Sequence, residues 1–235
     1  MSVDGGQPLQ LTFFDTATSF GPAWSPDGRR IAFICDQGGT PKVWVVHLDG
    51  GMASPLDKTN ASDTNKRLAW FPNPEIIYQQ PEMHNLRRLQ LETQMEEPVL
   101  PADSEKGWLY GSPNFSPDGK KFAVPWNRNN QDGLWVINLE KYSERLLAPG
   151  SYNSLGWSPD GNLVYAANGG PEIYQIGLSG SKQTRTVTTM PGNVSTGAVS
   201  SDGRKIIVSV VEMKSDVWLM KDFDPQLARE KQSDH

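Results

Sequence analysis

Short apolar runs recur along this chain, and their spacing is the feature that organises it. Each run follows an anchor in which an aromatic or apolar residue precedes a polar turn. The first residues of successive anchors lie 46, 45, 42 and 42 positions apart. The five anchors are Trp24-Ser25-Pro26-Asp27-Gly28, Trp70-Phe71-Pro72-Asn73-Pro74, Phe115-Ser116-Pro117-Asp118-Gly119, Trp157-Ser158-Pro159-Asp160-Gly161 and Val199-Ser200-Ser201-Asp202-Gly203.

Each anchor is followed by further runs that have the pattern of β-strands. A β-rich run comes first, at residues 30–34, 76–78, 121–124, 163–165 and 205–208. A run with apolar alternation comes next, at residues 43–46, 86–89, 134–137, 173–176 and 217–220. A weaker run follows, as at residues 143–147 and 184–188. Alternation of period two between turns rich in Gly and Pro indicates strands, so each repeat holds four, counting the strand that ends at its anchor.

A four-stranded repeat of this length is typical of a propeller blade. The sequence therefore predicts an all-β fold, a β-propeller of about five four-stranded blades, in a single domain over residues 1–223. Residues 224–235 form a polar tail. We expect residues 7–12 to pair with residues 217–221 and to close the ring by completing the last blade. A fragment of a larger propeller would have the same pattern, so both interpretations stay open.

The anchors have the chemistry of tight turns. Proline sets φ for the first corner of a type I turn, aspartate suits the next corner, and glycine accepts the left-handed conformation that follows. The preceding aromatic residue is expected to fill the wedge between neighbouring blades. A ring of metal-binding carboxylates is the alternative, which we regard as weaker because each aspartate occupies a hairpin corner. The anchor residues are Trp24, Asp27, Gly28, Trp70, Phe115, Asp118, Gly119, Trp157, Asp160, Gly161, Asp202 and Gly203.

The second anchor lacks the Asp-Gly pair, and we expect its turn to have another shape.

Composition narrows the classes of partner. The formal net charge of −5 provides no basic surplus to neutralise phosphates, which argues against nucleic acid. The single cysteine, Cys35, lies in an apolar run and is expected to be a small buried residue. We find no run of membrane-spanning length and no signal-peptide pattern. We therefore expect no membrane insertion by this chain. The compartment is periplasmic or extracytoplasmic if the chain belongs to an exported or anchored parent, and cytoplasmic otherwise.

The repeated Trp-Ser-Pro-Asp-Gly anchors, followed by strands such as Arg29-Arg30-Ile31-Ala32-Phe33, resemble the TolB-like propeller family over residues 7–223. The final segment, residues 215–224, is most similar to the last blade of bacterial sensor proteins. In those proteins the propeller follows a kinase or a winged-helix domain. The resemblance implies the blade type, whereas function must be argued from a site because this fold hosts many functions.

Known catalytic patterns are not found in the sequence. Residues 177–181 end in serine, so they lack the Gly-x-Ser-x-Gly of a hydrolase. The histidines His47, His84 and His235 have no partners at metal-ligand spacing. No phosphate-binding or dinucleotide motif is present. We expect no cofactor, no metal and no enzymatic activity.

Binding is the expected role, on the connections that join the second and third strands of each repeat, because variable loops on a rigid scaffold commonly carry recognition. The connection at residues 125–132 combines an aromatic residue, amides and an arginine, which suits a protein or peptide partner; a small polar ligand and a plain solvated loop are the alternatives. The candidate residues are Trp126, Asn127, Arg128 and Asn130, with His84 on a neighbouring connection.

Three functions remain open. The first is a non-catalytic binding module, such as the sensor part of a larger signalling or envelope protein. The second is the substrate-gating propeller of a prolyl-oligopeptidase-like serine peptidase whose catalytic domain is absent. The third, disfavoured by the missing cluster of histidines and carboxylates, is a lyase or glycosidase.

Overall fold

The computed structural model describes residues 7, 9–56, 68–71, 75–79, 86–100, 107–179 and 184–211 of the 235-residue chain. These residues form five antiparallel sheets and no helix. The predicted domain end at residue 223, the strand at 217–220 and the tail lie outside the described residues.

Four of the five sheets run in simple chain order. Sheet 1 has the order β1-β2-β3-β4, sheet 2 β5-β6-β7-β8, and sheet 4 β14-β15-β16-β17. Sheet 3 has the order β10-β11-β12-β13, with β9 added beside β11, and sheet 5 consists of β18 and β19. The strands are β1 Ser19–Trp24, β2 Arg30–Cys35, β3 Lys42–His47, β4 Ser54–Pro55, β5 Leu68–Trp70, β6 Glu75–Gln79, β7 Leu86–Gln90, β8 Glu96–Pro98, β9 Gly107–Leu109, β10 Asn114–Phe115, β11 Lys121–Arg128, β12 Gln131–Asn138, β13 Ser143–Pro149, β14 Asn153–Trp157, β15 Leu163–Ala167, β16 Glu172–Gly177, β17 Thr184–Thr189, β18 Asn193–Val199 and β19 Ile206–Val211.

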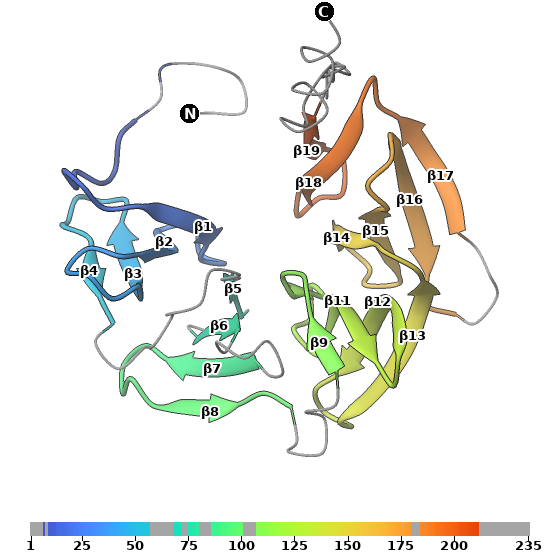
Figure 1. Ribbon diagram of the computed structural model, residues 1–235, viewed down its shortest axis with the longest axis horizontal. Coiled ribbons are helices and arrows are strands. Elements are labelled where there is room, and N and C mark those ends of the chain that lie inside the picture. Colours follow the sequence, from blue (N-terminus) through green and yellow to red (C-terminus); the bar gives the residue numbers. More distant parts are fainter. Residues whose placement is uncertain are drawn as a thin grey trace, which may run out of the picture.

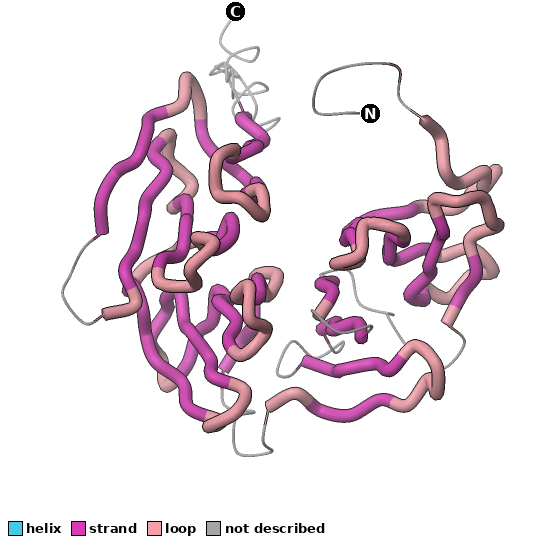
Figure 2. Tube along the Cα trace, turned by 180° about the vertical axis from the view of Figure 1, so that it is seen from behind, coloured by secondary structure: helices cyan, strands magenta, loops and turns pink. Residues whose placement is uncertain are grey.

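The sheets follow one another in chain order around a central opening (Figure 1). Strands β1, β5 and β14 lie toward that opening, and β4, β8, β13 and β17 lie on the outer rim. The reverse view shows the same arrangement, with turns joining the strands (Figure 2). The predicted all-β fold of repeated four-stranded antiparallel units is confirmed.

Four of the predicted anchor turns share one network of hydrogen bonds. In the first, the Gly28 amide donates to the Ser25 carbonyl at 2.9 Å, and Gly28 adopts a φ of +68°. The Ser25 hydroxyl donates to Asp27 Oδ1 at 2.5 Å and accepts from the Arg30 amide at 2.9 Å. Asp27 Oδ1 also accepts from the Arg29 amide at 3.0 Å. The turns that begin at Ser116, Ser158 and Ser200 repeat these bonds.

The interpretation of the aspartates as turn residues is therefore confirmed. The serine hydroxyl and the backbone amide lower the pKa of all four aspartates, because both donate to the charged carboxylate: Asp27, Asp118, Asp160 and Asp202. The second anchor differs, as predicted. There the Phe71 amide donates to the Glu75 carbonyl across four positions, whereas Ser25 and Arg30 are five positions apart.

Anchor tryptophans join neighbouring sheets, as predicted for Trp70 and Trp157. The indole N–H of Trp70 donates to the Ala23 carbonyl of sheet 1 at 2.7 Å. The indole N–H of Trp157 donates to the Asn114 carbonyl of sheet 3 at 2.8 Å. In both cases the acceptor is the residue just before the preceding anchor. Each bond therefore joins equivalent positions of two successive repeats. Phe115 instead packs edge-to-face on Phe71, with ring centroids 5.0 Å apart.

Apolar clusters fill the interfaces between successive sheets. Trp70 and Leu89 of sheet 2 pack with Ala32 and Ile34 of sheet 1, and comparable clusters join sheets 2 and 3, 3 and 4, and 4 and 5. Cys35 is fully buried, as expected for a small apolar residue, on the other face of sheet 1.

That other face of sheet 1 is not covered by a neighbouring sheet among the described residues. Trp24 is 61% exposed and pairs with Ile31 across β1 and β2, which places both side chains on this face. Residues 9–14 form no strand, contrary to the prediction for residues 7–12. Leu11 and Phe14 instead pack beside Phe33 and Trp44. The predicted pairing partner, residues 217–221, lies outside the described residues.

A first prediction concerns the serine of the anchor turn. Ser116 is buried, and its replacement by alanine removes the bond to Asp118 and leaves the Lys121 amide without its acceptor. We expect Ser116→Ala to lower the free energy of unfolding by about 1–2 kcal/mol. Urea unfolding would measure the change. Ser143→Ala, at an exposed strand position, is the control and should change it by about 0.5 kcal/mol or less; an equal effect of both would contradict the turn network.

Candidate binding site at the junction of sheets 3 and 4

The connection predicted as a binding loop is a tight hairpin instead. Strand β11 pairs with β12 as far as Arg128 and Gln131, so only Asn129 and Asn130 lie between them. Their φ angles are +53° and +59°. Two consecutive left-handed residues are typical of a type I′ turn, and asparagine tolerates that conformation. The expectation of an open loop within residues 125–132 was wrong.

Two of the predicted contact residues are internal. Trp126 is fully buried and Arg128 is 8% exposed. The Arg128 guanidinium lies 5.0 Å from the Trp126 ring centroid, and its Nε donates to Glu144 Oε1 at 2.8 Å. Trp126 belongs to the cluster between sheets 2 and 3. A contact of Trp126 and Arg128 with a partner would therefore require the core to open. Of the other predicted contact residues, Asn130 is exposed at the turn, and His84 lies outside the described residues.

Asn127 faces the opposite side of sheet 3 and takes part in a row across three strands. It pairs with Trp108 of β9 on one side and with Asp132 of β12 on the other. Directly paired residues point to the same face of a sheet, so these three side chains lie side by side. The Asn127 amide donates to Asp132 Oδ1 at 2.7 Å. Trp108 is 51% exposed, so this row presents an aromatic surface, an amide and a carboxylate together.

Tyr110 continues the row just beyond β9. It follows Trp108 by two positions, and its amide donates to the Pro125 carbonyl at 3.2 Å, which continues the β9–β11 alignment. Burial raises the pKa of the Tyr110 hydroxyl, and the nearby Asp132 carboxylate adds to this effect because a second negative charge would be repelled. We refer to Trp108, Tyr110, Asn127 and Asp132 as the Trp108 site.

Among the described residues, the geometric criteria give no hydrogen-bond partner to two buried hydroxyls, Tyr110 OH of the site and Ser154 Oγ of sheet 4. Ser154 is paired with Ala166, which belongs to the cluster between sheets 3 and 4, so its side chain faces sheet 3. Buried hydroxyls without protein partners are commonly satisfied by ordered water. The junction of the two sheets below the Trp108 site is therefore suited to water-mediated contacts.

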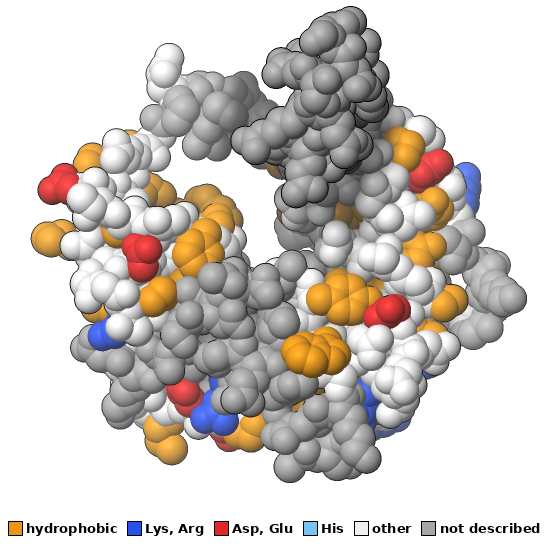
Figure 3. All heavy atoms as spheres, in the orientation of Figure 1, with side chains coloured by type: hydrophobic (Ala, Val, Ile, Leu, Met, Phe, Trp, Pro, Cys, Tyr) orange, Lys and Arg blue, Asp and Glu red, His pale blue; other side chains and the backbone are white. Residues whose placement is uncertain are grey.

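In the space-filling view, hydrophobic side chains and one acidic side chain lie together over the region of β9 and β12 (Figure 3). This shows an accessible surface of mixed character on this face. Sequence reasoning missed Trp108 and Tyr110 because it considered only the connections inside each repeat. The signal that could have found them is Gly107-Trp108-Leu109-Tyr110-Gly111, an aromatic pair in the connection between two repeats.

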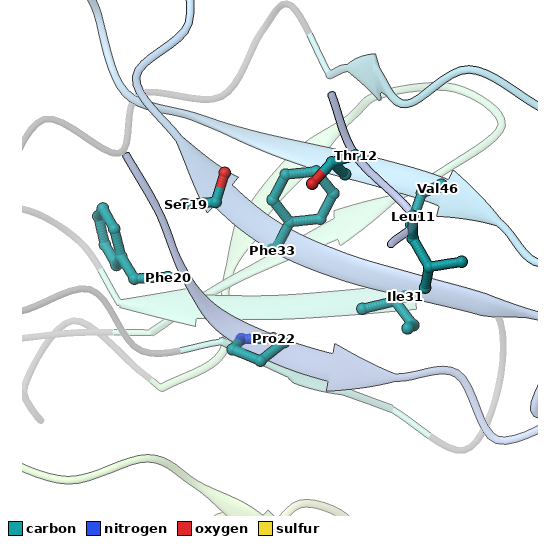
Figure 4. Close-up of a pocket in the computed structure, with 8 residues that line it drawn as sticks. All are labelled: Leu11, Thr12, Ser19, Phe20, Pro22, Ile31, Phe33 and Val46. Atoms are coloured by element: carbon teal, nitrogen blue, oxygen red, sulfur yellow. The ribbon is translucent and has the colours of Figure 1, made fainter. Parts of the chain in front are cut away.

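A pocket lies elsewhere, on the exposed face of sheet 1, with a volume of about 220 Å³. Leu11 lies beside Ile31 and Val46, and Phe20, Phe33 and Pro22 surround the remainder (Figure 4). Ser19 and Thr12 are the polar residues among the described ones that line it. The lining residues that the structure describes include no titratable group, and the pocket is part of the same face that carries Trp24.

The described residues hold no group of three or more His, Cys, Asp or Glu side chains that could bind a metal ion. Nor does this part of the chain contain a helix that is long and apolar enough to cross a membrane.

Comparison with known proteins supports the fold. A profile of the TolB beta propeller domain family matches residues 89–231, more than half of the chain. An uncharacterized protein of Agrobacterium fabrum is 28% identical over 138 residues, which cover 52% of this chain and 44% of that protein. The chain thus matches less than half the length of this relative.

Two solved structures show the same architecture. TolB from Acinetobacter baumannii superposes with a TM-score of 0.63 at 23% identity, over 77% of this chain and 47% of TolB. A prolyl endopeptidase superposes with a TM-score of 0.57 at 16% identity, over 84% of this chain and 32% of the peptidase. At these identities the similarities establish the propeller fold.

A second prediction follows from the internal position of Arg128. Arg128→Ala removes a guanidinium that is stacked on Trp126 and bonded to Glu144, so we expect a loss of about 1–3 kcal/mol in the free energy of unfolding. Arg145→Ala, at an exposed position of β13 next to Glu144, should change it by about 0.5 kcal/mol or less. Chemical denaturation of both variants would measure this. Unchanged stability of Arg128→Ala would show that the residue has no structural role.

Proposed function

We propose that this chain, which belongs to the TolB beta propeller domain family, is a non-catalytic module that binds a protein or peptide partner through the Trp108 site. The observation that supports this most is the half-exposed Trp108 beside the polar pair Asn127 and Asp132. Aromatic residues with adjacent polar groups are enriched at the centres of protein interfaces. The site lies on paired strands, so its side chains are held in place before a partner arrives.

Hydrogen bonding at the site also favours a polar partner. Asn127 keeps its amide carbonyl as an acceptor after donating to Asp132, and Asp132 keeps its second carboxylate oxygen. An extended peptide offers backbone amides that could donate to both, together with side chains that could cover Trp108. Within a longer protein, such a module would serve as the sensor part of a signalling or envelope protein.

The alternative proposal is a substrate-gating propeller of a prolyl-oligopeptidase-like enzyme whose catalytic domain is on another part of the protein. The superposition on a prolyl endopeptidase supports this alternative, since this chain corresponds to about a third of that enzyme. A hydrolase domain encoded next to this sequence would favour it over the binding module.

Ring closure is a separate proposal, supported by the exposed Trp24. Trp70 and Trp157 each donate to the carbonyl of the residue before the preceding anchor, and Trp24 occupies the equivalent position in the first repeat. The equivalent acceptor in sheet 5 is Ala198, directly before Val199. Sheet 5 also exposes Ile207, which pairs with Ala198, and Val211. We propose that these two apolar faces meet in a five-bladed ring.

A third prediction tests this closure. If Trp24 donates to Ala198, Trp24→Phe should lower the free energy of unfolding by about 1 kcal/mol, as should the control Trp157→Phe. The unfolding midpoint should not depend on protein concentration, because both faces belong to one chain. An unchanged stability of Trp24→Phe would contradict closure. A midpoint that rises with concentration would show that a second copy covers this face.

A fourth prediction tests the binding role. Peptides selected from a random phage-displayed library on the immobilised chain should bind the free protein, and Trp108→Ala should weaken that binding on the order of tenfold or more. Phe13→Ala, which removes another exposed aromatic side chain, should leave the affinity unchanged. Isothermal titration would measure both variants. Failure to select any peptide, or equal affinity for Trp108→Ala, would overturn the proposal.

A further inference from the structure

The protein twice holds an arginine side chain in the same way. The Arg30 guanidinium lies 5.1 Å from the Trp70 ring centroid and 3.5 Å from the Asp27 carboxylate. The Arg128 guanidinium lies 5.0 Å from the Trp126 ring centroid and 2.8 Å from the Glu144 carboxylate. A tryptophan face and a carboxylate therefore form a recurring guanidinium site in this chain, which matches the known preference of arginine for stacking combined with charged hydrogen bonds.

The Trp108 site contains the same two components at an accessible position. Trp108 and Asp132 are both paired with Asn127, from opposite sides. Neighbouring strands are about 4.8 Å apart, so the backbones of Trp108 and Asp132 are separated by roughly 10 Å. A planar cation lying above Asn127 would fit between the indole and the carboxylate.

The charge of the site is also suited to a cation. Asp132 is exposed and accepts a hydrogen bond from Asn127, and among the described residues it forms no ion pair. The nearest arginine along β11, Arg128, points to the other face and is held by Glu144. Burial, and next to it the negative charge of Asp132, raise the pKa of Tyr110. A positively charged ligand would offset that charge.

We propose that the Trp108 site recognises a basic side chain, arginine above all, of the bound partner. This rests on the proposed binding function and names the chemistry that the site selects. The guanidinium would stack on the exposed surface of Trp108 and donate to the free oxygen of Asp132. Phosphate groups are disfavoured by the carboxylate, and the chain's net charge of −5 also favours a basic partner. A neutral sugar could stack on Trp108 but would not use the charge of Asp132.

The test uses nuclear magnetic resonance with the ¹⁵N-labelled chain. Trp108→Phe assigns the indole resonance of Trp108 among the eight tryptophans. The probes are the capped peptide Gly-Arg-Gly and the same peptide with citrulline, which has the shape of arginine without its charge. We expect the arginine peptide to shift the Trp108 resonance with an affinity on the order of tenfold higher than the citrulline peptide.

The variant Asp132→Asn keeps the side-chain shape and the acceptor for Asn127, and it should abolish the preference for arginine. Asp15→Asn removes one exposed carboxylate elsewhere and should preserve the preference, which controls for net charge. Urea unfolding verifies that both variants fold. Equal shifts by the two peptides, or a preference that survives Asp132→Asn, would overturn the inference.

The outcomes separate this inference from the proposed function. If selected peptides depend on Trp108 but arginine and citrulline are not distinguished, the binding function stands and the basic-residue inference fails. If a neutral sugar such as maltose shifts the Trp108 resonance more strongly than either peptide, the site is a saccharide site and both proposals fail.

Discussion

The structure depends on the packing of each sheet against the next. A sheet of two- to eight-residue strands has two faces, and neither can be left in water without a large loss of apolar burial. The apolar clusters between successive sheets bury both faces, because each cluster is built from residues of two repeats. Trp70, for example, belongs to sheet 2 but packs and hydrogen-bonds with sheet 1. The indole N–H bonds then fix the relative position of the sheets, because each requires one particular carbonyl.

The position of the Trp108 site follows from this packing. One face of sheet 3 is occupied by Trp126, Leu109 and the cluster shared with sheet 2. The alternation of side chains sends Trp108 and Asn127 to the other face, beyond the part that Ala123 and Leu134 bury against sheet 4. The long β11–β12 hairpin and the added strand β9 extend past that core. The polar and aromatic side chains of the Trp108 site therefore lie at the end of the interface between sheets 3 and 4, outside its apolar cluster.

The anchors and most strands could be predicted from the sequence because they depend on local chemistry. The Pro-Asp-Gly turn and the alternation at residues 43–46 or 134–137 each specify a structure within a few residues. The serine hydroxyl that completes the turn was not predicted, although it is repeated in the sequence as regularly as the aspartate.

The site could not be predicted in the same way. Trp126 and Trp108 are both tryptophans near the end of a strand, and one is buried whereas the other is half exposed. That difference depends on where β11 ends and on the pairing of β9 with β11, which joins residues 17 to 21 positions apart in the sequence. A run of asparagines looks like an open loop, and only the positive φ of Asn129 and Asn130 turns it into a two-residue hairpin. The exposure of a side chain such as Trp108 thus depends on which strands pair in the folded protein, and local sequence patterns do not predict it.

Because each interface is shared between two repeats, the number of interfaces that a sheet has determines how easily it opens locally. Sheet 3 is covered on both faces, by the clusters that join it to sheets 2 and 4. Sheet 5 is held by one described cluster, in which its Val194 packs with Leu155 and Ile173 of sheet 4. Local opening needs fewer contacts to break at a sheet with one such interface. As long as sheet 1 does not cover the other face of sheet 5, the backbone amides of β18 and β19 should exchange with solvent through smaller fluctuations than those of β11 and β12, where the Trp108 site lies.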